Sequence, residues 1–528
     1  MRRAYSVETV RTAERRLMER LPEGALMQRA AAGLAATCAE LLGRVRGSGG
    51  GGRVYGSRVV LLVGSGDNGG DALYAGARLA RRGAGVTAVL LTPGRAHAGG
   101  LAALRRAGGS VTGATGPVGP AGSTGRTGPT GTAVPDELIA RADLVVDGIV
   151  GIGGRGGLRP DAVPFARAAE RSRAAVVAVD LPSGVDADTG EVRGVALRAD
   201  LTVTFGTHKP GLLVDPAREY AGSVRLVDIG LDLPAQPVLE ALQHADVARL
   251  LPVPGAESDK YRRGVVGIAA GSARYPGAAV LAVSGALRGG AGAVRYVGPA
   301  QDAVIARFPE TLVSDRGPKK AGRVQAWVTG PGAGEDAGTV AEVLAADVPV
   351  LIDADGLRLA DRDAVRARTA PTLMTPHAGE AAALLGVARE EVEGARLAAV
   401  RELASRYSAT VLLKGSTTLI ADPGAHPEAH PDSGPDSGPG SGPVGGAVGG
   451  AVRVNATGTP WLATAGSGDV LSGLAGSLLA AGLSARDAGS AAAYLHGLAC
   501  RFASDGAPVG AHDVAEALPR AWRDVRDV

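Results

Sequence analysis

Short, wholly apolar runs recur along the chain, and each is followed by a turn rich in glycine or acidic residues and then by a helical pattern. The first of these runs is Val59–Val63, and Ala175–Val179 and Val265–Ala269 have the same character. Strands that are apolar on both sides are typical of parallel sheets covered by helices on both faces. Ligands of such sheets bind beyond the carboxyl ends of the strands. The pattern therefore predicts an α/β fold whose functional residues follow its strands.

The composition is that of a large, soluble protein, which we expect to be cytoplasmic. The chain has 528 residues, 45% of them apolar, and this length predicts roughly two to four domains. The net charge of +3, without a stripe of basic and aromatic residues, argues against a nucleic-acid partner. The charged N-terminus lacks a signal-peptide core, and no apolar run is long enough to span a membrane. We expect Cys38 and Cys500 to be buried free thiols in a reducing compartment.

The first glycine-rich turn lies between a strand and a helix. The sequence Gly64-Ser-Gly66-Asp-Asn-Gly69 follows Val59–Val63 and precedes a helix expected at Asp71–Arg82. This context suits a phosphate or a dinucleotide. The next expected strand, Val86–Leu91, does not end in the acidic residue that binds the ribose in nicotinamide dehydrogenases. An ordinary dehydrogenase is therefore disfavoured.

Two further strands of the first half lead into an aspartate. Asp147 follows the strand Asp143–Val146, and Asp180 follows Ala175–Val179. Because strand ends meet at one edge of a sheet, we expect Asn68, Asp147 and Ser183 to converge. Their hard oxygen atoms suit an alkali or alkaline-earth cation and not zinc. The alternative is that each residue is an ordinary turn former.

These motifs together resemble a known family. GSGDNGGDALYAG, DGIVGIGGRGG and VDLPSGVDADTG, with LMQRAAAG at 26–33 and TFGTHKPGL at 204–212, resemble the epimerase domain of NAD(P)H-hydrate repair enzymes. The resemblance covers roughly residues 1–232 and implies a Rossmann-like three-layer sandwich that interconverts the two epimers of the hydrated dinucleotide. It implies K⁺ bound by Asn68, Asp147 and Ser183, and a carboxylate such as Asp180 to assist the reaction. The implied substrate contacts are Asp67, Asn68, Gly69, Gly70, Asp71, Gly151, Ile152, Gly153, Gly154, Arg155, Gly156, Gly157 and Asp180.

One substrate contact departs from the family pattern. Asp67 stands where the family usually carries asparagine, which adds a negative charge to the loop.

Three segments interrupt the strand and helix patterns. Glycine recurs at every third position from Gly113 to Gly131, which resembles collagen by composition, but we expect a disordered surface insertion at 113–131. Residues 423–450 are rich in proline, glycine and serine, and a second disordered insertion is expected there. Leu231–Val253 carries three prolines and is expected to join a domain at 1–232 to one at 240–528.

The second half again alternates strands with helices, which predicts a second parallel sheet. Strands are expected at Val265–Ala269, Val324–Val328, Val350–Ile352, Thr372–Met374 and Val411–Leu413, and helices near 277–288, 338–346, 379–385 and 390–407.

Polar residues follow these strands too. Asp353 and Asp355 would bind Mg²⁺ indirectly, or they are ordinary loop residues. His377, with Glu380 three residues later, is a site residue or a structural histidine. Lys414, at a strand end before a glycine, fits a phosphate contact.

The decamer Thr464–Gly473, TAGSGDVLSG, is a turn of small residues followed by an apolar helical run at Val470–Leu483. The unpaired N–H groups at the start of such a helix suit an anion. Asp469 is expected in the first helical turn, where the helix dipole favours its ionised form. A charged carboxylate beside an anion site is a natural partner for a substrate hydroxyl. The alternative is an aspartate that only caps a helix after a flexible turn.

With this decamer, the second half resembles the ribokinase-like dehydratase domain of the same repair enzymes. ARYPGAAVLAVSGALRGGAG, TGPGAG, TPHAGE, LLKGSTTLI and ATAGSGDVLSG occur in family order, and the resemblance covers about residues 240–528. It implies a second three-layer sandwich. The implied contacts are Ala278, Gly332, His377 and Asp469 to the hydrated dinucleotide, and Lys414, Gly415, Ser416, Thr417, Thr418 and Gly468 to the adenine nucleotide. The loop Ser258-Asp259-Lys260 departs from the family's usual Ser-His-Lys.

The chemistry implied by the resemblance is coherent. Hydroxide is a poor leaving group, and phosphorylation makes it a good one. Asp469 would accept the proton of the substrate hydroxyl as that oxygen attacks the terminal phosphate of a nucleotide held with Mg²⁺. Fused bacterial members use ADP as co-substrate, but the sequence itself does not choose between ADP and ATP.

The leading hypothesis is therefore a bifunctional NAD(P)H-hydrate epimerase and dehydratase. We expect it to form a homo-oligomer and to act on small molecules, with no nucleic-acid or membrane partner. The alternatives are a ribokinase-like small-alcohol kinase with an accessory dinucleotide-binding domain, which leaves the first half unexplained, and a non-catalytic dinucleotide-binding scaffold.

Overall fold

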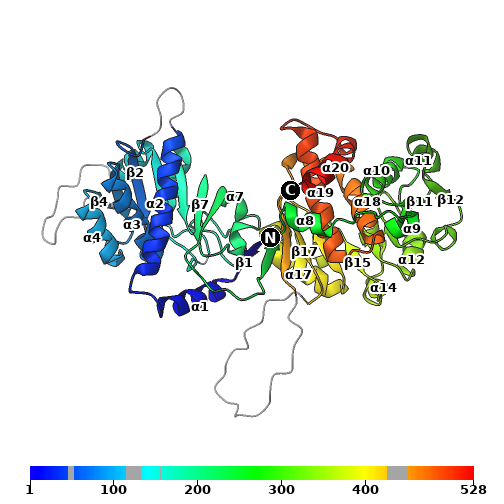
Figure 1. Ribbon diagram of the computed structural model, residues 1–528, viewed down its shortest axis with the longest axis horizontal. Helices are drawn as coiled ribbons and strands as arrows, with labels where there is room; N and C mark the ends of the chain where they lie inside the picture. Colours follow the sequence, from blue (N-terminus) through cyan, green and yellow to red (C-terminus); the bar gives the residue numbers. More distant parts are fainter. Residues whose placement is uncertain (46–52, 115–132, 155, 425–449, 528) are drawn as a thin grey trace, which may run out of the picture. The chain divides into compact units, whose positions relative to one another are not determined.

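The chain forms two compact units, which are described separately. The computed structural model describes residues 1–45, 53–114, 133–154, 156–424 and 450–527. The N-terminal unit is Arg3–Pro237, and the C-terminal unit is Val238–Val528 together with Met1–Arg2 (Figure 1). The two predicted insertions, at 113–131 and 423–450, lie almost entirely outside the described residues. Within the described residues, no helix combines the length and apolar character needed to cross a bilayer.

A parallel sheet forms the centre of the N-terminal unit. Among the described residues it has seven strands in the order β4-β3-β2-β5-β6-β7-β8, and every pair is parallel. Its central strands are buried on both faces, as their apolar sequences predict. The strands are β2 (Arg58–Val63), β3 (Gly85–Leu90), β4 (Ser110–Gly113), β5 (Leu144–Gly148), β6 (Ala175–Val179), β7 (Leu201–Phe205) and β8 (Ser223–Val227).

Helices cover both faces of this sheet. One core contains residues of α2, α3 and α4 with one face of the strands, and a second core contains residues of α5 and α6 with the other face. This arrangement is the predicted Rossmann-like three-layer sandwich. The helices are α1 (Val7–Met18), α2 (Ala25–Val45), α3 (Asp67–Arg81), α4 (Ala98–Arg106), α5 (Ala133–Ala140), α6 (Val163–Arg171) and α7 (Arg218–Ala221), with 3₁₀ turns η1 (Pro93–Arg95) and η2 (Pro210–Leu212).

Helix α3 starts earlier than the sequence suggested. Its first residue is Asp67 rather than the predicted Asp71, and Gly66 is its N-cap. The polar residues assigned to a loop therefore form the first helical turn. The turn lies close to the strand end that precedes it: a Cβ on Gly69 would be 2.5 Å from the carbonyl oxygen of Gly64. Only glycine allows this approach, and it brings the helix N-terminus to the edge of the sheet.

The C-terminal unit is built on a longer sheet that is not wholly parallel. Its order among the described residues is β1-β9-β18-β17-β16-β15-β14-β13-β10-β11-β12. β17 runs antiparallel to both neighbours, so the prediction of a purely parallel sheet is wrong at this end. The strands are β1 (Arg2–Ala4), β9 (Leu239–Ala241), β10 (Val265–Ala269), β11 (Ala293–Val297), β12 (Leu312–Ser314), β13 (Ala326–Thr329), β14 (Val350–Ile352), β15 (Thr372–Met374), β16 (Thr410–Leu413), β17 (Thr418–Ala421) and β18 (Val452–Asn455).

Helices again form layers on the two faces. The large core contains residues of α10, α18, α19 and α20, while α12 and α17 pack on strands of the same sheet outside that core. The helices are α8 (His244–Leu250), α9 (Lys260–Arg263), α10 (Pro276–Arg288), α11 (Gln301–Arg307), α12 (Ala337–Leu344), α13 (Asp355–Leu359), α14 (Arg362–Arg366), α15 (Ala378–Leu385), α16 (Arg389–Gly394), α17 (Arg396–Tyr407), α18 (Ser467–Ala480), α19 (Ala485–Ser504) and α20 (Ala511–Arg526), with 3₁₀ turns η3 (Pro318–Lys320) and η4 (Pro460–Leu462).

Two segments of the second half were misassigned from sequence. The predicted linker at Leu231–Val253 contains β9 and α8, because Leu239 and Val247 are fully buried core residues among the prolines. The predicted helix at 390–407 is two helices, α16 and α17, separated at Ala395. Gly394 immediately before the break lowers helix propensity there.

Helices α10 and α18 touch backbone to backbone. A Cβ on Gly473 would lie 1.9 Å from the carbonyl oxygen of Ala282, and one on Gly285 would lie 2.2 Å from that of Val470. Glycine at both positions is therefore required by packing. The contact fixes the N-terminus of α18, which carries Asp469, against the helix that carries Ala278.

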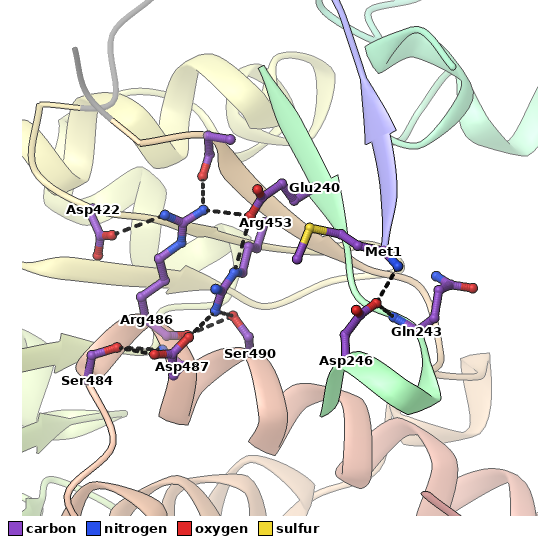
Figure 2. Close-up of polar contacts among 11 residues, drawn as sticks. Met1, Glu240, Gln243, Asp246, Asp422, Arg453, Ser484, Arg486, Asp487 and Ser490 are labelled. Carbon is purple, nitrogen blue, oxygen red and sulfur yellow. Dashed lines mark hydrogen bonds and ion pairs between the residues drawn. The ribbon is translucent and has the colours of Figure 1, made fainter. Parts of the chain in front are cut away.

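A cluster of ion pairs ties the antiparallel end of the sheet to α19 (Figure 2). Arg453 on β18 lies 2.5 Å from Asp487 and 3.6 Å from Glu240, and Arg486 lies 3.2 Å from Glu240. All four side chains are largely buried, so their charges compensate one another where water is scarce. The cluster anchors β9 and β18, which are two of the strands that sequence reasoning missed.

Candidate functional site

The carboxyl ends of β2, β5 and β6, which are neighbours in the N-terminal sheet, bring the predicted epimerase residues to one edge. A Cβ on Gly151 would lie 2.8 Å from Oδ1 of Asn68, so the loop after β5 touches the first turn of α3. Gly157 lies against the backbone of Arg193. Arg155 lies outside the described residues. Val7 and Arg11 of α1, with Ile152, Gly153, Gly154, Asp186, Ala187 and Asp188, line a cavity of about 210 Å³.

Asp180, directly after β6, forms a buried ion pair that the sequence did not reveal. Its Oδ1 accepts hydrogen bonds from Nζ of Lys209 at 2.5 Å and from Oγ1 of Thr204 at 2.9 Å. The Lys209 side chain is only 1% exposed, and its Nζ also donates to the carbonyl oxygen of Phe205. The Phe205 amide also donates to Oδ1 of Asp180, so three donors surround this one carboxylate oxygen. Asp180 also has a φ of 65°, a left-handed conformation that aspartate adopts at some cost.

The residues expected to hold potassium lie at the same edge. Asp147 is fully buried, and it accepts hydrogen bonds from Oγ of Ser183 at 2.6 Å and from the Ser183 amide at 2.8 Å. Nδ2 of Asn68 donates to the carbonyl oxygen of Val179, which fixes the orientation of the Asn68 amide group. Burial raises the pKa of Asp147 to about 6, while the hydrogen bonds from Ser183 and Ile149 lower it.

This donor set fits an alkali cation. Within the described residues, the buried Asp147 carboxylate accepts hydrogen bonds from the neutral donors Ile149 and Ser183, so a cation would supply compensating charge. The amide oxygen of Asn68 and the hydroxyl oxygen of Ser183 complete a hard-ligand set. Within the described ranges, no group of three or more His, Cys, Asp or Glu residues is arranged to hold a metal ion.

In the C-terminal unit, Asp469 occupies the first turn of α18, after a turn in which Gly466 has a φ of 87°. Burial and the nearby charge of Asp353 raise the pKa of Asp469 to about 7, while Lys414 opposes the rise. The expectation that the helix dipole keeps this carboxyl fully ionised is therefore wrong, because desolvation outweighs the dipole. An acid that titrates near neutral pH is suited to accept a proton from a hydroxyl.

Lys414 does not stand free at its strand end. Its Nζ donates to Oδ1 of Asp353 at 2.6 Å, and Oδ2 of Asp353 accepts from Oγ of Ser472 at 2.7 Å. Glu380 lies 3.7 Å from the same Nζ. A Cβ on Gly468 would lie 3.5 Å from Nζ of Lys414, so the lysine faces the glycine turn while it neutralises Asp353. The structure thus joins Lys414, Gly468 and Asp469 in one place.

His377 is the N-cap of α15 rather than an isolated side chain. Its Nδ1 accepts hydrogen bonds from the amides of Gly379 and Glu380, and the Glu380 carboxylate accepts one from the His377 amide. The ring is more than half exposed, so it retains a free face beside its structural role. His377 can therefore cap α15 and still contact a ligand, so the two interpretations of this histidine are compatible.

The remaining predicted residues line the neighbouring loops. A Cβ on Gly332 would lie 2.8 Å from that of Ala278, which places the loop after β13 against the start of α10. The turn at 414–418, with Gly415, Ser416, Thr417 and Thr418, follows β16. The buried Arg396 donates to the carbonyl oxygens of Lys414 and Thr417 and so braces this turn. Asp355 accepts from the amide of Gly334, which shapes the loop after β13.

Sequence reasoning missed several residues that support these sites. Lys209 was visible only as part of the TFGTHKPGL segment, since a lysine before a proline has no chemical signature alone. Ser472 lies one helical turn beyond Asp469 in α18, and Arg396 is the first residue of α17. Each acts through a partner distant in sequence, such as Asp353 for Ser472, and a one-dimensional pattern does not reveal such pairs.

Comparisons with known proteins agree with the two-unit architecture. A model of the family described as YjeF-related protein N-terminus matches residues 23–211, and one described as NAD(P)H-hydrate dehydratase matches 266–446 and 445–520. The bifunctional NAD(P)H-hydrate repair enzyme Nnr of Mycobacterium leprae is 46% identical over 532 residues, which cover 100% of this chain and 99% of that protein. The protein of the same name from Corynebacterium glutamicum is 37% identical and covers 80% of this chain and 78% of its own length.

A solved structure is also similar. The ADP/ATP-dependent NAD(P)H-hydrate dehydratase from Bacillus subtilis, co-crystallised with ATP/Mg²⁺, is 28% identical and covers 54% of this chain and 97% of that chain, with a TM-score of 0.45. The assignment rests on the full-length sequence relatives and on both family models. Because these matches extend across both units, the chain belongs to the family of bifunctional NAD(P)H-hydrate repair enzymes.

Proposed function

We propose that the N-terminal unit interconverts the two epimers of hydrated NADH and NADPH, and that the C-terminal unit dehydrates one of them back to NAD(P)H in a nucleotide-dependent reaction. The observation that carries the proposal is the position of Asp469, which follows a glycine turn at the N-terminus of α18 and interacts electrostatically with Lys414. This geometry combines a proton acceptor with an anion site. Family membership favours this function over the small-alcohol kinase, which gave the first half no role.

In the C-terminal unit, Asp469 accepts the proton of the ring hydroxyl while that oxygen attacks the terminal phosphorus of the nucleotide. The bond from phosphorus to the departing nucleotide breaks, so ADP leaves AMP. The phosphorylated ring then loses phosphate from one carbon and a proton from the neighbouring carbon, which restores the double bond of NAD(P)H. The helix N-terminus and Lys414 stabilise the negative charge of the transferring group.

Magnesium would neutralise charge on the nucleotide phosphates. Asp353 and Asp355 supply carboxylate oxygens at this edge, but Asp353 already binds Lys414 and Ser472 through both oxygens. These residues would therefore hold Mg²⁺ through its water ligands, as Mg²⁺ often permits. Ala278, Gly332 and His377 would contact the hydrated dinucleotide, and residues 414–418 with Gly468 the adenine nucleotide.

In the N-terminal unit, the first turn of α3 and the loop at 151–157 would bind the dinucleotide. Asp180 would exchange a proton with the reacting ring, with Lys209 as its positioning partner, since the buried ammonium group holds one oxygen of that carboxylate. Potassium at Asn68, Asp147 and Ser183 would supply fixed positive charge near the strand ends.

The test is the recovery of absorbance at the reduced-nicotinamide wavelength from a mixture of both epimers, with ADP and with ATP. The full chain should convert the whole mixture. Asp180→Asn should convert only the epimer that the dehydratase accepts, apart from slow uncatalysed exchange, and Asp469→Asn should convert neither. Complete conversion by both variants at the wild-type rate would contradict the proposal.

A further inference from the structure

The N-terminal unit has a cluster of carboxyl groups close to Asp180, the carboxylate proposed to act in epimerisation. Asp67 and Asp71 lie four residues apart on one face of α3. Asp71 interacts electrostatically with Asp180, Asp67 and Glu14 of α1, and Glu14 in turn interacts with Asp180 and Asp67. Lys209, which also interacts with Glu14, is bound to Asp180. Carboxyl groups that repel one another at a buried site do not all ionise at neutral pH, so the cluster retains a proton.

Asp71 is the member of the cluster best placed to carry that proton. It is 8% exposed, and its buried Oδ1 has no hydrogen-bond partner among the residues that the structure describes. Asp180, by contrast, has three donors on one oxygen. Burial raises the pKa of Asp71 well above its ordinary value, and the charges of Asp180, Asp67 and Glu14 raise it further. The site therefore combines an acid that retains its proton with a carboxylate that is held by three donors, a division of roles found in proton-transfer enzymes.

Glu14 comes from an element that is not part of the sheet or its two helix layers. Helix α1 begins at Val7, and its Arg11 has Nη2 3.3 Å from where a Cβ of Gly153 would lie. Glu14, one turn later, interacts with Lys209, Asp180, Asp67 and Arg11, and burial raises its pKa. Helix α1 thus closes one side of the edge where the glycine loop and Asp180 meet.

Epimerisation at a hydroxyl-bearing ring carbon beside nitrogen needs both an acid and a base. The carbon–oxygen bond breaks as the nitrogen lone pair forms a carbon–nitrogen double bond, and the oxygen leaves as water once it receives a proton. Water then adds to the opposite face, and a carboxylate accepts the proton released. One proton is given and one is taken back, so no other reactant is needed.

We propose that Asp71 donates the proton to the departing hydroxyl, and that Glu14, on the side of the site that α1 closes, is its positioning partner. This inference rests on the proposed epimerase function and deepens it. It assigns a proton-transfer role to a residue otherwise expected only to bind substrate.

The experiment uses the full chain without nucleotide, so that dehydration does not occur. One purified epimer is supplied, and its approach to equilibrium is followed by chromatography. Asp71→Asn keeps the shape of the side chain but carries no transferable proton, and it should slow epimerisation by about 10²–10³-fold. Asp161→Asn, at an exposed aspartate of the same unit, is the matched control and should keep the wild-type rate.

A second variant separates proton transfer from a structural role. Glu14→Gln removes a negative charge that raises the pKa of Asp71, so Asp71 should lose its proton at lower pH. The descending limb of the epimerase pH profile should therefore move to lower pH. A purely structural role would lower the rate at every pH without moving that limb.

The outcomes distinguish this inference from the proposed function. Wild-type protein that equilibrates the epimers no faster than buffer would overturn the epimerase assignment itself. An active wild type with Asp71→Asn above half its rate would overturn the role of Asp71 alone. Dehydration of the correct epimer by the same Asp71→Asn sample, on addition of ADP, together with an N-terminal melting transition no lower than wild type, shows that the variant is folded.

Discussion

Each unit pairs an aspartate at a strand end with a lysine, but the two lysines differ in access to solvent. The Lys209 side chain is 1% exposed and lies on Asp180, whereas that of Lys414 is 19% exposed and lies on Asp353. A fully buried lysine can only fix its carboxylate. A partly exposed lysine facing Gly468 can also meet an incoming phosphate. The difference matches the proposed chemistry, since only the C-terminal reaction transfers phosphorus.

The acids beside these pairs differ as well. In the N-terminal unit the lysine binds the proposed catalytic carboxylate directly. In the C-terminal unit it binds Asp353, and Asp469 is left with a pKa of about 7, raised first by burial and then by Asp353. A carboxylate that titrates near neutral pH is a base suited to the attack of an alcohol on phosphorus.

The largest expected effect is on Asp469. Asp469→Asn removes the proton acceptor and should slow dehydration by about 10³-fold, or about 4 kcal/mol of transition-state stabilisation. Nucleotide affinity, measured by calorimetry, should remain within a few-fold of wild type, because the glycine turn and Lys414 are unchanged. Epimerisation by the same sample is the control. Dehydration at the wild-type rate would leave this carboxylate without a catalytic role.

Replacing each lysine with methionine should show that the two ion pairs contribute unequally to the stability of their units. Lys209→Met removes the lysine counterion of the buried Asp180, which keeps only neutral donors from Thr204 and Phe205, and should lower the stability of the N-terminal unit by about 3–5 kcal/mol. Lys414→Met should cost less, because the Lys414 side chain is partly exposed, so that solvent replaces part of the lost interaction with Asp353. Hydrogen exchange assigns each loss to its unit, and Lys319→Met, at an exposed lysine, is the matched control. Equal losses from Lys209→Met and Lys414→Met would contradict the comparison.

The strands show which parts of the fold could be predicted from the sequence. Strands such as Val350–Ile352 and Thr372–Met374 were predicted with their observed bounds, because a buried run between turn residues is readable locally. The antiparallel direction of β17 was missed, since an apolar run does not encode which neighbour it joins. The burial of both cysteines as free thiols is confirmed.

The candidate sites divide in the same way. Asp180 and Asp469 were found because they follow a strand or a glycine turn. Lys209 was missed as the partner of Asp180, and Ser472 is separated by 119 positions from Asp353. The ionisation of Asp469 was misjudged because the helix dipole is visible in sequence whereas desolvation is a property of the packed site.

The pH dependence of dehydration tests the environment of Asp469. The base must be ionised, and its pKa is about 7, so kcat/KM should rise with pH and level off above 7. Below pH 6 it should fall about tenfold per unit. Lys414→Met removes a charge that lowers this pKa, so the rising limb should move to higher pH. A limb that stays in place would mean that Lys414 does not act on Asp469.

The smallest expected effect concerns potassium, which should act on one unit only. Asn68, Asp147 and Ser183 offer oxygen ligands around a buried carboxylate, and a cation bound there stabilises the folded N-terminal unit. Replacing choline with potassium at constant ionic strength should stabilise this unit by about 1 kcal/mol and raise its melting temperature by about 2–4 °C. Asp147→Asn should abolish the shift.

All three tryptophans, Trp327, Trp461 and Trp522, lie in the C-terminal unit, so their fluorescence should show no such shift. An equal shift in both units would mean that potassium acts as a general salt and that the three oxygen ligands do not form a site.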